Sequence, residues 1–433
     1  MTDERVTIGD LSEHLNEEVE LLAWVRNHRS SGKLLFVILR DGTGEVQLVV
    51  ARDEVDAASW EAAEGLDYET SVRVRGRVKR DERAPSGVEL AARSVEVLGP
   101  SEDYPIQQKE HGVDFLLNHR HLWLRHPRQV AIMRVRNEVI RGIHDFFYER
   151  DFLQIDTPIL TGAIGEEAGT LFETEYFDEG TAYLAQTGQL YVEAAAAAFR
   201  KVYCFGPTFR AEKSKTRRHL TEFWMVEPEM AWTDSEESME IQEAMVCAVV
   251  DRVLDRCVEE LETLDRDLSR LEAVRAPFDR MSYTEAVETL QERGSAIEWG
   301  EDLGGEDETL LTEGRDRPLF VHDYPKGAKA FYMKENPADP RTVKCDDLLA
   351  PEGYGEVIGG SQREDDHDRL LARIREEGLP EEAYDWYLDL RRYGTFPHSG
   401  FGLGLERTVA WMCGVEHIRE CIPFPRMMNR LEP

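Results

Sequence analysis

The sequence predicts an α+β protein in which a small β-barrel precedes a larger mixed domain. Two observations predict this class. About the first hundred residues contain short β-like runs separated by turns, with one small helical stretch. Beyond them, β-like runs alternate irregularly with long amphipathic stretches. That second pattern favours an antiparallel sheet flanked by helices over a doubly wound parallel sheet.

The N-terminal part has the strand pattern of a small barrel. A hairpin-type turn is expected at residues 41–44 and a small helix over residues 53–64. Four or five short strands in about a hundred residues fit an OB-fold, which commonly binds single-stranded nucleic acid. A small barrel without such a ligand fits the same pattern. The β-like runs are residues 19–25, 34–40, 45–50 and 71–78.

A segment rich in proline and acidic residues, at positions 99–105, separates the two parts. We therefore expect a barrel domain over residues 1–103, a hinge over residues 104–130 and the larger domain over residues 131–433.

The larger domain is expected to open with a helix and a strand. Apolar residues at helical spacing run over residues 129–150, and the β-like run at residues 152–158 ends in proline. Helices are also expected over residues 236–271 and 364–392. A strand followed by a helix is expected over residues 400–414.

The composition limits the class of protein. A formal net charge of −34 is spread over the whole chain, which indicates a salt-rich cytoplasm, as in a halophile, rather than an acidic tail. No run of 18 apolar residues occurs and the first residues lack signal-peptide features, so a cytoplasmic protein is expected. The six cysteines are scattered and predict neither a disulfide framework nor a zinc site.

The most informative segment is residues 202–232. A β-like run precedes a basic tract at residues 213–218, and a second β-like run starts near His219. The pattern predicts a hairpin that holds a nucleotide, with Arg210 on a strand and aimed at a phosphate. Phe223 would offer its ring to a base. The segment resembles motif 2 of the class II aminoacyl-tRNA synthetases.

A second signature lies at residues 400–407, GFGLGLER. Its glycines allow the backbone to approach a ligand, and Arg407 is expected to begin a helix, whose N-terminus favours anions. The run resembles motif 3. The helix and strand over residues 129–158 resemble motif 1, which forms the dimer interface in that family. The motifs together imply a class II catalytic core and a homodimer.

The resemblance assigns roles in ATP binding. Arg210 would bind the α-phosphate, where charge develops as the adenylate forms. Arg407 would pack on the adenine face opposite Phe223, near the γ-phosphate, while Arg218 and His219 would hold the outer phosphates. The amino-acid carboxylate attacks phosphorus directly, so no acid or base is required. The expected ATP-binding set is Arg210, Glu212, Arg218, His219, Leu220, Phe223, Glu356, Gly404 and Arg407, and its catalytic members are Arg210, Glu356 and Arg407.

Magnesium is expected beside the phosphates, because residues 346–356 supply hard oxygen ligands. Glu356 matches the family's metal-bridging glutamate, and Asp347 is the expected second acid. Asp346 or Asp347 could instead be a solvated turn acid. Some relatives have serine where this chain has Gly359, which leaves one metal contact open.

An OB-fold joined to this core resembles subclass IIb, whose members load aspartate, asparagine or lysine. Val192 stands where aspartate enzymes have the lysine that pairs with the substrate carboxylate, and a buried carboxylate without its cation is costly. Glu227 replaces an aspartate of those enzymes. Together with Arg363 it can recognise a carboxamide, because Glu227 can accept a hydrogen bond from the NH₂ group and Arg363 can donate one to the oxygen.

The remaining amino-acid contacts also come from the resemblance. Glu166 matches a mobile-loop acid that closes on the α-amino group, and Gln189 would assist it. An acidic solvent loop is the alternative for the Glu166 segment. The runs GPTFRAE, HLTEFWMVEPE, DLLAPEGYGE and PHSGFGLGLER resemble the asparaginyl-tRNA synthetases, in their archaeal form, over essentially the whole chain.

Aromatic and basic groups are interleaved in the barrel, which suits base stacking over a positive groove. The resemblance implies that Phe36 stacks on the middle anticodon base, that Gln47 and Glu89 read base edges, and that Arg26 contacts the backbone or first base. Each could instead be structural, with Phe36 in the barrel core. The implied partner is tRNA(Asn) with anticodon GUU.

The resemblance therefore implies an enzyme that joins L-asparagine to tRNA(Asn) with ATP and releases AMP and diphosphate. An aspartate enzyme, which could charge both tRNAs, is the nearest alternative, and Val192 and Glu227 argue against it. An ATP-dependent asparagine synthetase on the same core would lack the OB domain. The intact Arg210, Glu356 and Arg407 oppose a nucleic-acid-binding protein with an inactive core.

Overall fold

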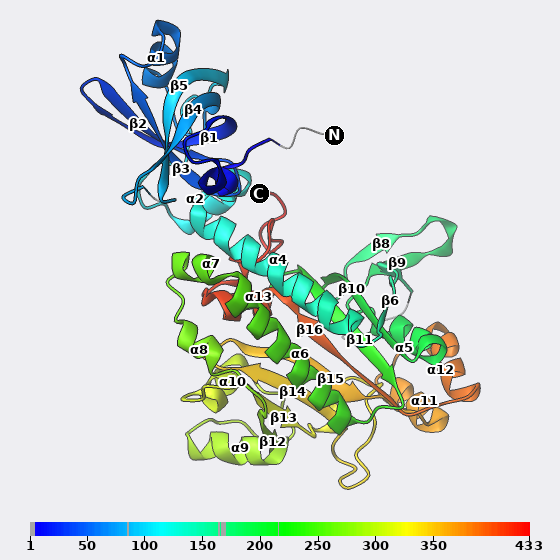
Figure 1. Ribbon diagram of the computed structural model, residues 1–433. Coiled ribbons are helices and arrows are strands. Elements are labelled where there is room, and N and C mark those ends of the chain that lie inside the picture. The colour runs from blue at the N-terminus through cyan, green and yellow to red at the C-terminus, as the bar shows by residue number, and fades with distance from the viewer. Residues whose placement is uncertain (1–4, 85, 163–164, 166–169, 215) are drawn as a thin grey trace. The chain divides into compact units, whose positions relative to one another are not determined.

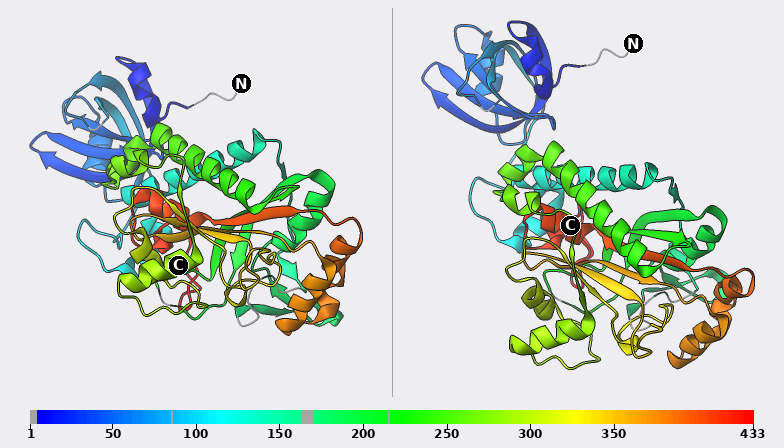
Figure 2. Two further views of the ribbon diagram at one scale, coloured as in Figure 1. Left: turned by 90° about the horizontal axis from the view of Figure 1, so that it is seen from below. Right: turned by 60° about the horizontal axis from the view of Figure 1, so that its bottom comes forward.

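The computed structural model describes residues 5–84, 86–162, 165, 170–214 and 216–433 (Figures 1 and 2). The chain divides into two compact units, Met1–His111 and Gly112–Pro433. None of the helices described in either unit combines the length and apolar character that crossing a lipid bilayer requires.

The first unit is a closed barrel with the strand order β1-β2-β3-β5-β4. Alternate residues of β2, such as Leu35, Val37 and Leu39, are buried in its core, as the two-residue period of a strand requires. The helix α1 begins after Asp56, whose side chain accepts a hydrogen bond from the Ser59 amide. The elements are η1 (Ile8–His14), β1 (Glu18–Ser31), β2 (Leu34–Arg40), β3 (Glu45–Ala51), α1 (Ala57–Glu64), β4 (Ser71–Arg80) and β5 (Val88–Gly99).

The predicted barrel strands are confirmed, and one strand was missed. β5 follows a turn and pairs with both β3 and β4, which closes the barrel. Its residues Leu90, Ala91 and Ala92 are all buried, so the strand lacks the clean alternation that marks the other four.

The second unit is built on an eight-stranded sheet in the order β12-β13-β14-β15-β16-β11-β10-β6. Its central strands are antiparallel, as expected, and only the outer pairs β12–β13 and β10–β6 are parallel. The strands are β6 (Leu153–Gln154), β10 (Lys201–Phe209), β11 (Glu222–Ala231), β12 (Asp279–Ser282), β13 (Leu319–His322), β14 (Cys345–Ala350), β15 (Gly355–Gln362) and β16 (His398–Gly404). A smaller sheet has the order β7-β9-β8, with β7 (Leu160–Thr161), β8 (Glu173–Glu175) and β9 (Thr181–Leu184).

Helices α4 and α6 lie across one face of the large sheet (Figures 1 and 2). Their apolar residues, such as Val139 and Val249, share one core with α13 and with Val226, Phe401 and Leu403 of the sheet. The helices are α2 (Val113–Asn118), α3 (Arg120–Trp123), α4 (Pro127–Tyr148), α5 (Gln189–Phe199), α6 (Ser235–Arg256), α7 (Val258–Thr263), α8 (Leu268–Glu272), α9 (Tyr283–Glu292), α10 (Gly305–Thr312), α11 (His367–Glu376), α12 (Asp385–Arg392) and α13 (Leu405–Cys413). Short 3-10 turns are η3 (Phe177–Glu179), η4 (Lys326–Ala328), η5 (Glu381–Tyr384) and η6 (Ile418–Glu420).

The long helix predicted over residues 236–271 is wrong in its continuity. It is three helices, with breaks at Cys257 and between Thr263 and Leu268. The sequence contains neither glycine nor proline there, so no local signal predicts a break. The breaks instead allow Leu261 and Leu271 to turn into the core.

Candidate active site

The two faces of β11 separate the protein core from a site. Val226 and Met230 are buried against the helices, so the intervening Glu227 and Glu229 project from the opposite face. The neighbouring strand β16 presents glycines at positions 400, 402 and 404 on that same face, while Phe401 enters the core. The glycines remove side chains from this face and leave space beside the acids.

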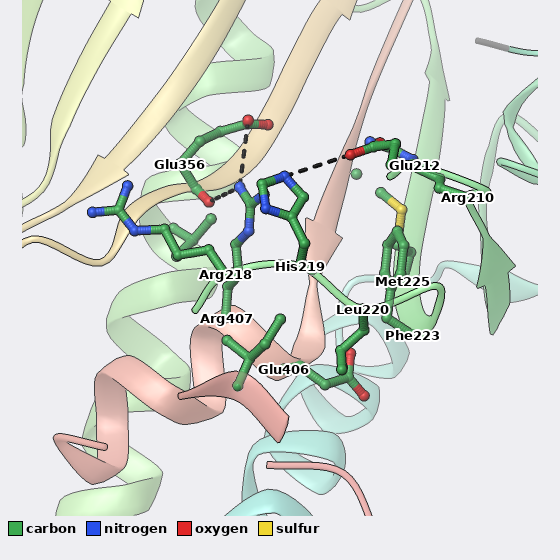
Figure 3. Close-up of a pocket in the computed structure, with 14 residues that line it drawn as sticks. Arg210, Glu212, Arg218, His219, Leu220, Phe223, Met225, Glu356, Glu406 and Arg407 are labelled. Atoms are coloured by element: carbon green, nitrogen blue, oxygen red, sulfur yellow. Dashed lines mark hydrogen bonds and ion pairs between the residues drawn. The ribbon is translucent and has the colours of Figure 1, made fainter. Parts of the chain in front are cut away.

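A pocket with an empty volume of about 620 Å³ opens on this face. It brings together all nine residues of the expected ATP-binding set, which come from the loop after β10 and from β11, β15, β16 and α13 (Figure 3). These are Arg210, Glu212, Arg218, His219, Leu220, Phe223, Glu356, Gly404 and Arg407.

Arg407 lies in the first turn of α13 and points back toward β15 (Figure 3). Its Nη1 donates to the backbone oxygen of Glu356 at 2.8 Å and lies 3.6 Å from the Glu356 Oε2. Arg210 follows β10 rather than lying on it, because the strand ends at Phe209. Its guanidinium carbon lies 5.5 Å from the centre of the Phe223 ring, so the motif 2 cation and aromatic ring are adjacent.

Arg218 is held by α10. Its Nη1 lies 3.0 Å from Glu308 Oε2 and its Nη2 donates to Thr309 Oγ1 at 2.8 Å. Burial, together with nearby cationic groups such as Arg407, lowers the pKa of His219 below its ordinary value, so the imidazole is neutral near pH 7. Its Nε2 lies 3.5 Å from Glu212 (Figure 3).

Three carboxyl groups lie beside the arginines. Burial and the nearby Glu356 raise the pKa of Glu308 to about 7 and that of Asp347 to about 6. The carboxyl groups of Asp347 and Glu356 converge on Gly359: a Cβ atom there would lie 3.6 Å and 3.0 Å from their oxygens. Lys329 Nζ lies 2.7 Å from Asp347 Oδ2 and offsets part of this charge.

The two adjacent aspartates of β14 face opposite sides of the sheet. Asp347 faces the site, whereas Asp346 lies on the side of Gln242 in α6, where burial raises its pKa to about 7. Both are buried in the strand, so the alternative that either is a solvated turn acid is wrong. Among the described residues, no group of three or more His, Cys, Asp or Glu side chains is arranged to hold a metal ion by itself.

Glu227 is surrounded by donors. The Thr187 hydroxyl donates to its Oε1, while the Gly188 amide donates to its Oε2 at 2.8 Å and the Cys204 thiol approaches the same oxygen at 3.4 Å. Val192 is fully buried in an apolar cluster with Cys204. Its position therefore places a hydrocarbon group, and no cation, next to the residues that hold Glu227.

Arg363 is held by a second acid of β11. Its Nη2 lies 2.9 Å from Glu229 Oε2, and Nη1 donates to the Ser361 hydroxyl. Although burial alone would lower it, the Glu229 carboxylate raises the pKa of Arg363 above its ordinary value. Glu229 was not predicted, although it lies two residues after Glu227 and therefore on the same face of the strand.

The close packing of Glu229 depends on Gly400. A Cβ atom at position 400 would collide with Glu229 Oε2 and with the backbone oxygen of Pro228. We expect Gly400→Ala to lower the free energy of unfolding by about 3 kcal/mol or more, because it overpacks the site and disturbs a buried ion pair. Thermal and urea denaturation measure this. Gly404→Ala is the control, because nothing lies within 4 Å of its Cβ position; a loss of more than about 1 kcal/mol there would contradict the packing argument.

Gln189 begins α5, and its backbone N–H donates to Thr187 Oγ1 at 3.0 Å. It is therefore brought next to Glu227, since both residues contact the same threonine. Glu166, expected to act with Gln189, lies outside the described residues.

The four predicted anticodon residues lie on the outward side of the barrel unit. Phe36 alternates with the buried Leu35 and Val37, so the alternative that places it in the barrel core is wrong. The Arg29 guanidinium lies 4.8 Å from the Phe36 ring centre. Gln47 and Glu89 face each other across β3 and β5, and Arg26 is the residue skipped at a bulge in the pairing of β1 with β2.

This fold and this arrangement of side chains define a class II tRNA synthetase. Residues 112–428 match the family described as tRNA synthetases class II (D, K and N), and residues 19–98 match the OB-fold nucleic acid binding domain. The predicted fold class is thereby confirmed.

Individual relatives narrow the family. The chain is 54% identical to the asparagine–tRNA ligase of Chloroflexus aurantiacus, over 99% of this chain and 98% of the relative. It is also 54% identical to that of Desulforamulus reducens, over 98% and 99%. The structure of asparaginyl-tRNA synthetase from Pyrococcus horikoshii complexed with asparaginyl-adenylate matches with a TM-score of 0.97 and 47% identity, over 100% of both chains. The chain therefore belongs to the asparagine–tRNA ligases.

Proposed function

We propose that the protein activates L-asparagine with ATP and transfers it to tRNA(Asn). The observation that carries the choice of amino acid is the environment of Glu227. Donors meet its carboxyl group on three sides, and the nearby Val192 offers no cation for a substrate carboxylate. An ionised Glu227 can accept a hydrogen bond from a carboxamide N–H and repels the side chain of aspartate.

The chemistry requires positioning and charge neutralisation. The asparagine carboxylate oxygen attacks the α-phosphorus, the bond to the bridging oxygen of diphosphate breaks, and diphosphate leaves with the electron pair. Arg210 neutralises the α-phosphate as charge develops on it, and Arg218, His219 and Arg407 hold the outer phosphates and the base. A ribose hydroxyl of the terminal tRNA nucleotide then attacks the activated carbonyl, and AMP leaves.

The acids of the pocket fit a magnesium ion. Three carboxyl groups near the phosphate-binding arginines would repel ATP, and the raised pKa values of Asp347 and Glu308 reflect that crowding. Mg²⁺ is usually bound by one or two carboxylates plus substrate phosphates, so Asp347 and Glu356 would hold it together with ATP. The ion would neutralise phosphate charge when bound.

Two partners complete the proposal. The outward side of the barrel, with Phe36, Gln47, Glu89 and Arg26, binds the anticodon of tRNA(Asn). A second copy of the chain binds through the α4 region, which carries the motif 1 resemblance. The protein acts in the cytoplasm, where tRNA is charged.

Amino-acid-dependent ATP–pyrophosphate exchange in molar KCl, with asparagine and aspartate in parallel, tests the function. Exchange with asparagine alone is expected. Exchange with aspartate would overturn the reading of the pocket, and no exchange with either amino acid would overturn the activity itself.

The barrel surface gives a separate prediction. Because stacking of a base on an aromatic ring contributes about 1–3 kcal/mol, Phe36→Ala should lower kcat/KM for tRNA aminoacylation about 5- to 150-fold. Pyrophosphate exchange, which needs no anticodon contact, should stay unchanged. Leu34→Ala, on the exposed side of the same strand, is the control. Equal losses in the two variants would contradict a specific stacking role.

A further inference from the structure

A fully buried acid lies next to the amino-acid pocket. Glu193 of α5 is 1% exposed and was not predicted to contribute to the site. Its Oε1 accepts from Gln189 Nε2 at 3.1 Å and from the Tyr387 hydroxyl at 2.7 Å. Its Oε2 accepts from Arg391 Nη2 at 2.7 Å and lies 2.9 Å from His398 Nε2. Four donors from three elements thus meet one carboxylate.

This arrangement uses all the acceptor capacity of the carboxylate, which has about four lone-pair positions. Although burial alone would raise it, Arg391 and His398 hold the pKa of Glu193 below its ordinary range. An ionised carboxylate only accepts hydrogen bonds. The amide of Gln189 must therefore turn its NH₂ group toward Glu193.

The contact with Glu193 determines which end of the Gln189 side-chain amide faces away from Glu193. With the NH₂ group facing Glu193, the carbonyl oxygen is the free end of the amide. A carbonyl oxygen accepts from an ammonium group, whereas an NH₂ group would repel it. Gln189 is also linked to Glu227, the residue proposed to recognise the substrate side chain. Thr187 Oγ1 accepts a hydrogen bond from the Gln189 backbone amide and donates one to Glu227.

We propose that Glu193 is a positioning residue that orients the Gln189 carbonyl oxygen to accept a hydrogen bond from the α-ammonium group of the amino acid. This inference rests on the proposed function. Glu193 itself contacts no substrate. It fixes which end of the Gln189 amide faces the pocket, and Arg391, His398 and Tyr387 hold its carboxylate in place.

Glu193→Gln tests the inference by pyrophosphate exchange. A glutamine at 193 can donate to Gln189, so the amide of Gln189 is free to reverse. We expect the KM for asparagine to rise about tenfold or more, with the KM for ATP changed less than about twofold. Succinamic acid, which is asparagine without its α-amino group, should inhibit the variant and the wild type with Ki values within about threefold. If the Ki of succinamic acid rises by the same factor as the KM for asparagine, the role of Glu193 is structural and the inference fails.

Three further variants make the test specific. Gln189→Glu combined with Glu193→Gln restores an acceptor facing the ammonium, so its KM for asparagine should fall at least about threefold below that of the single variant. Glu193→Asp keeps a carboxylate but retracts it from Gln189. It should therefore raise the KM for asparagine without changing the Ki of succinamic acid. Tyr387→Phe removes one donor without freeing the amide and should leave the KM within about threefold.

The outcomes are separable from those of the proposed function. A wild-type protein that shows no asparagine-dependent exchange would overturn the function and this inference with it. A wild-type protein that is active, with an unchanged asparagine KM in Glu193→Gln, would overturn only the role of Glu193. If the KM for asparagine of the Gln189→Glu, Glu193→Gln double variant stays as high as that of Glu193→Gln, the role of Glu193 is overturned as well.

Discussion

Replacing Arg210 with alanine is expected to abolish asparagine-dependent pyrophosphate exchange while tRNA binding remains measurable. Arg210 lines the pocket directly after β10, and its guanidinium lies beside the Phe223 ring. If ATP binds with its base near that ring, Arg210 is the cation placed to meet the α-phosphate. Removing one donor aimed at developing charge typically costs about 10²–10³ in rate, and removing a full positive charge costs at least that.

The measurement separates chemistry from folding and from tRNA binding. Exchange is measured at saturating asparagine and ATP, tRNA affinity by filter binding, and stability by thermal melting. Arg256→Ala is the matched control, because Arg256 ends α6 and is largely exposed, and it should retain wild-type exchange. Exchange retained by Arg210→Ala would remove Arg210 from the mechanism.

Periodicity predicted much of the fold because most elements carry a clear local signal. The strands of the barrel alternate apolar and polar residues, and α4 has apolar residues at helical spacing with a proline in its first turn. The elements that failed are those set by long-range packing. β5 is buried on both sides where it closes the barrel, and the breaks after α6 and α7 allow leucines to enter a core built by distant strands.

The candidate site divides in the same way. Residues within a recognisable run, such as Arg210 and Arg407, could be placed in one pocket from the sequence alone. Glu308 and Lys329 could not, because they lie outside the quoted runs and reach the site only through the packing of α10 and the segment before β14. The partner of Arg363 was also missed, because a strand's two-residue period places Glu227 and Glu229 on one face without deciding which of them meets the arginine.

The electrostatics of the pocket follow from these unpredicted residues. Arg218 pairs with Glu308 at 3.0 Å, while Lys329 pairs with Asp347 at 2.7 Å. An incoming triphosphate must compete with Glu308 for Arg218. The crowded carboxyl groups and the arginines therefore form a site of alternating charge, which suits a ligand that carries both phosphates and a cation.

Glu227→Gln is expected to change the amino-acid preference more than any other single substitution in the pocket. The carboxylate of Glu227 meets the Thr187 hydroxyl, the Gly188 amide and the Cys204 thiol. A glutamine presents only one acceptor oxygen to these donors, so its NH₂ group must face at least one of them. The variant should therefore lose both the orientation of residue 227 and its acceptor for the carboxamide N–H.

The expected loss in kcat/KM for asparagine is about 10²–10⁴-fold, because a site built to hydrogen-bond a polar group discriminates on that scale. The rate with aspartate should fall less, since the repulsion between two carboxylates is gone, and the ratio of asparagine to aspartate activation should drop. Both rates are measured by pyrophosphate exchange at fixed ATP. Glu240→Gln, at an exposed position of α6, is the control for the change of charge. An unchanged preference in Glu227→Gln would show that the carboxamide is recognised elsewhere.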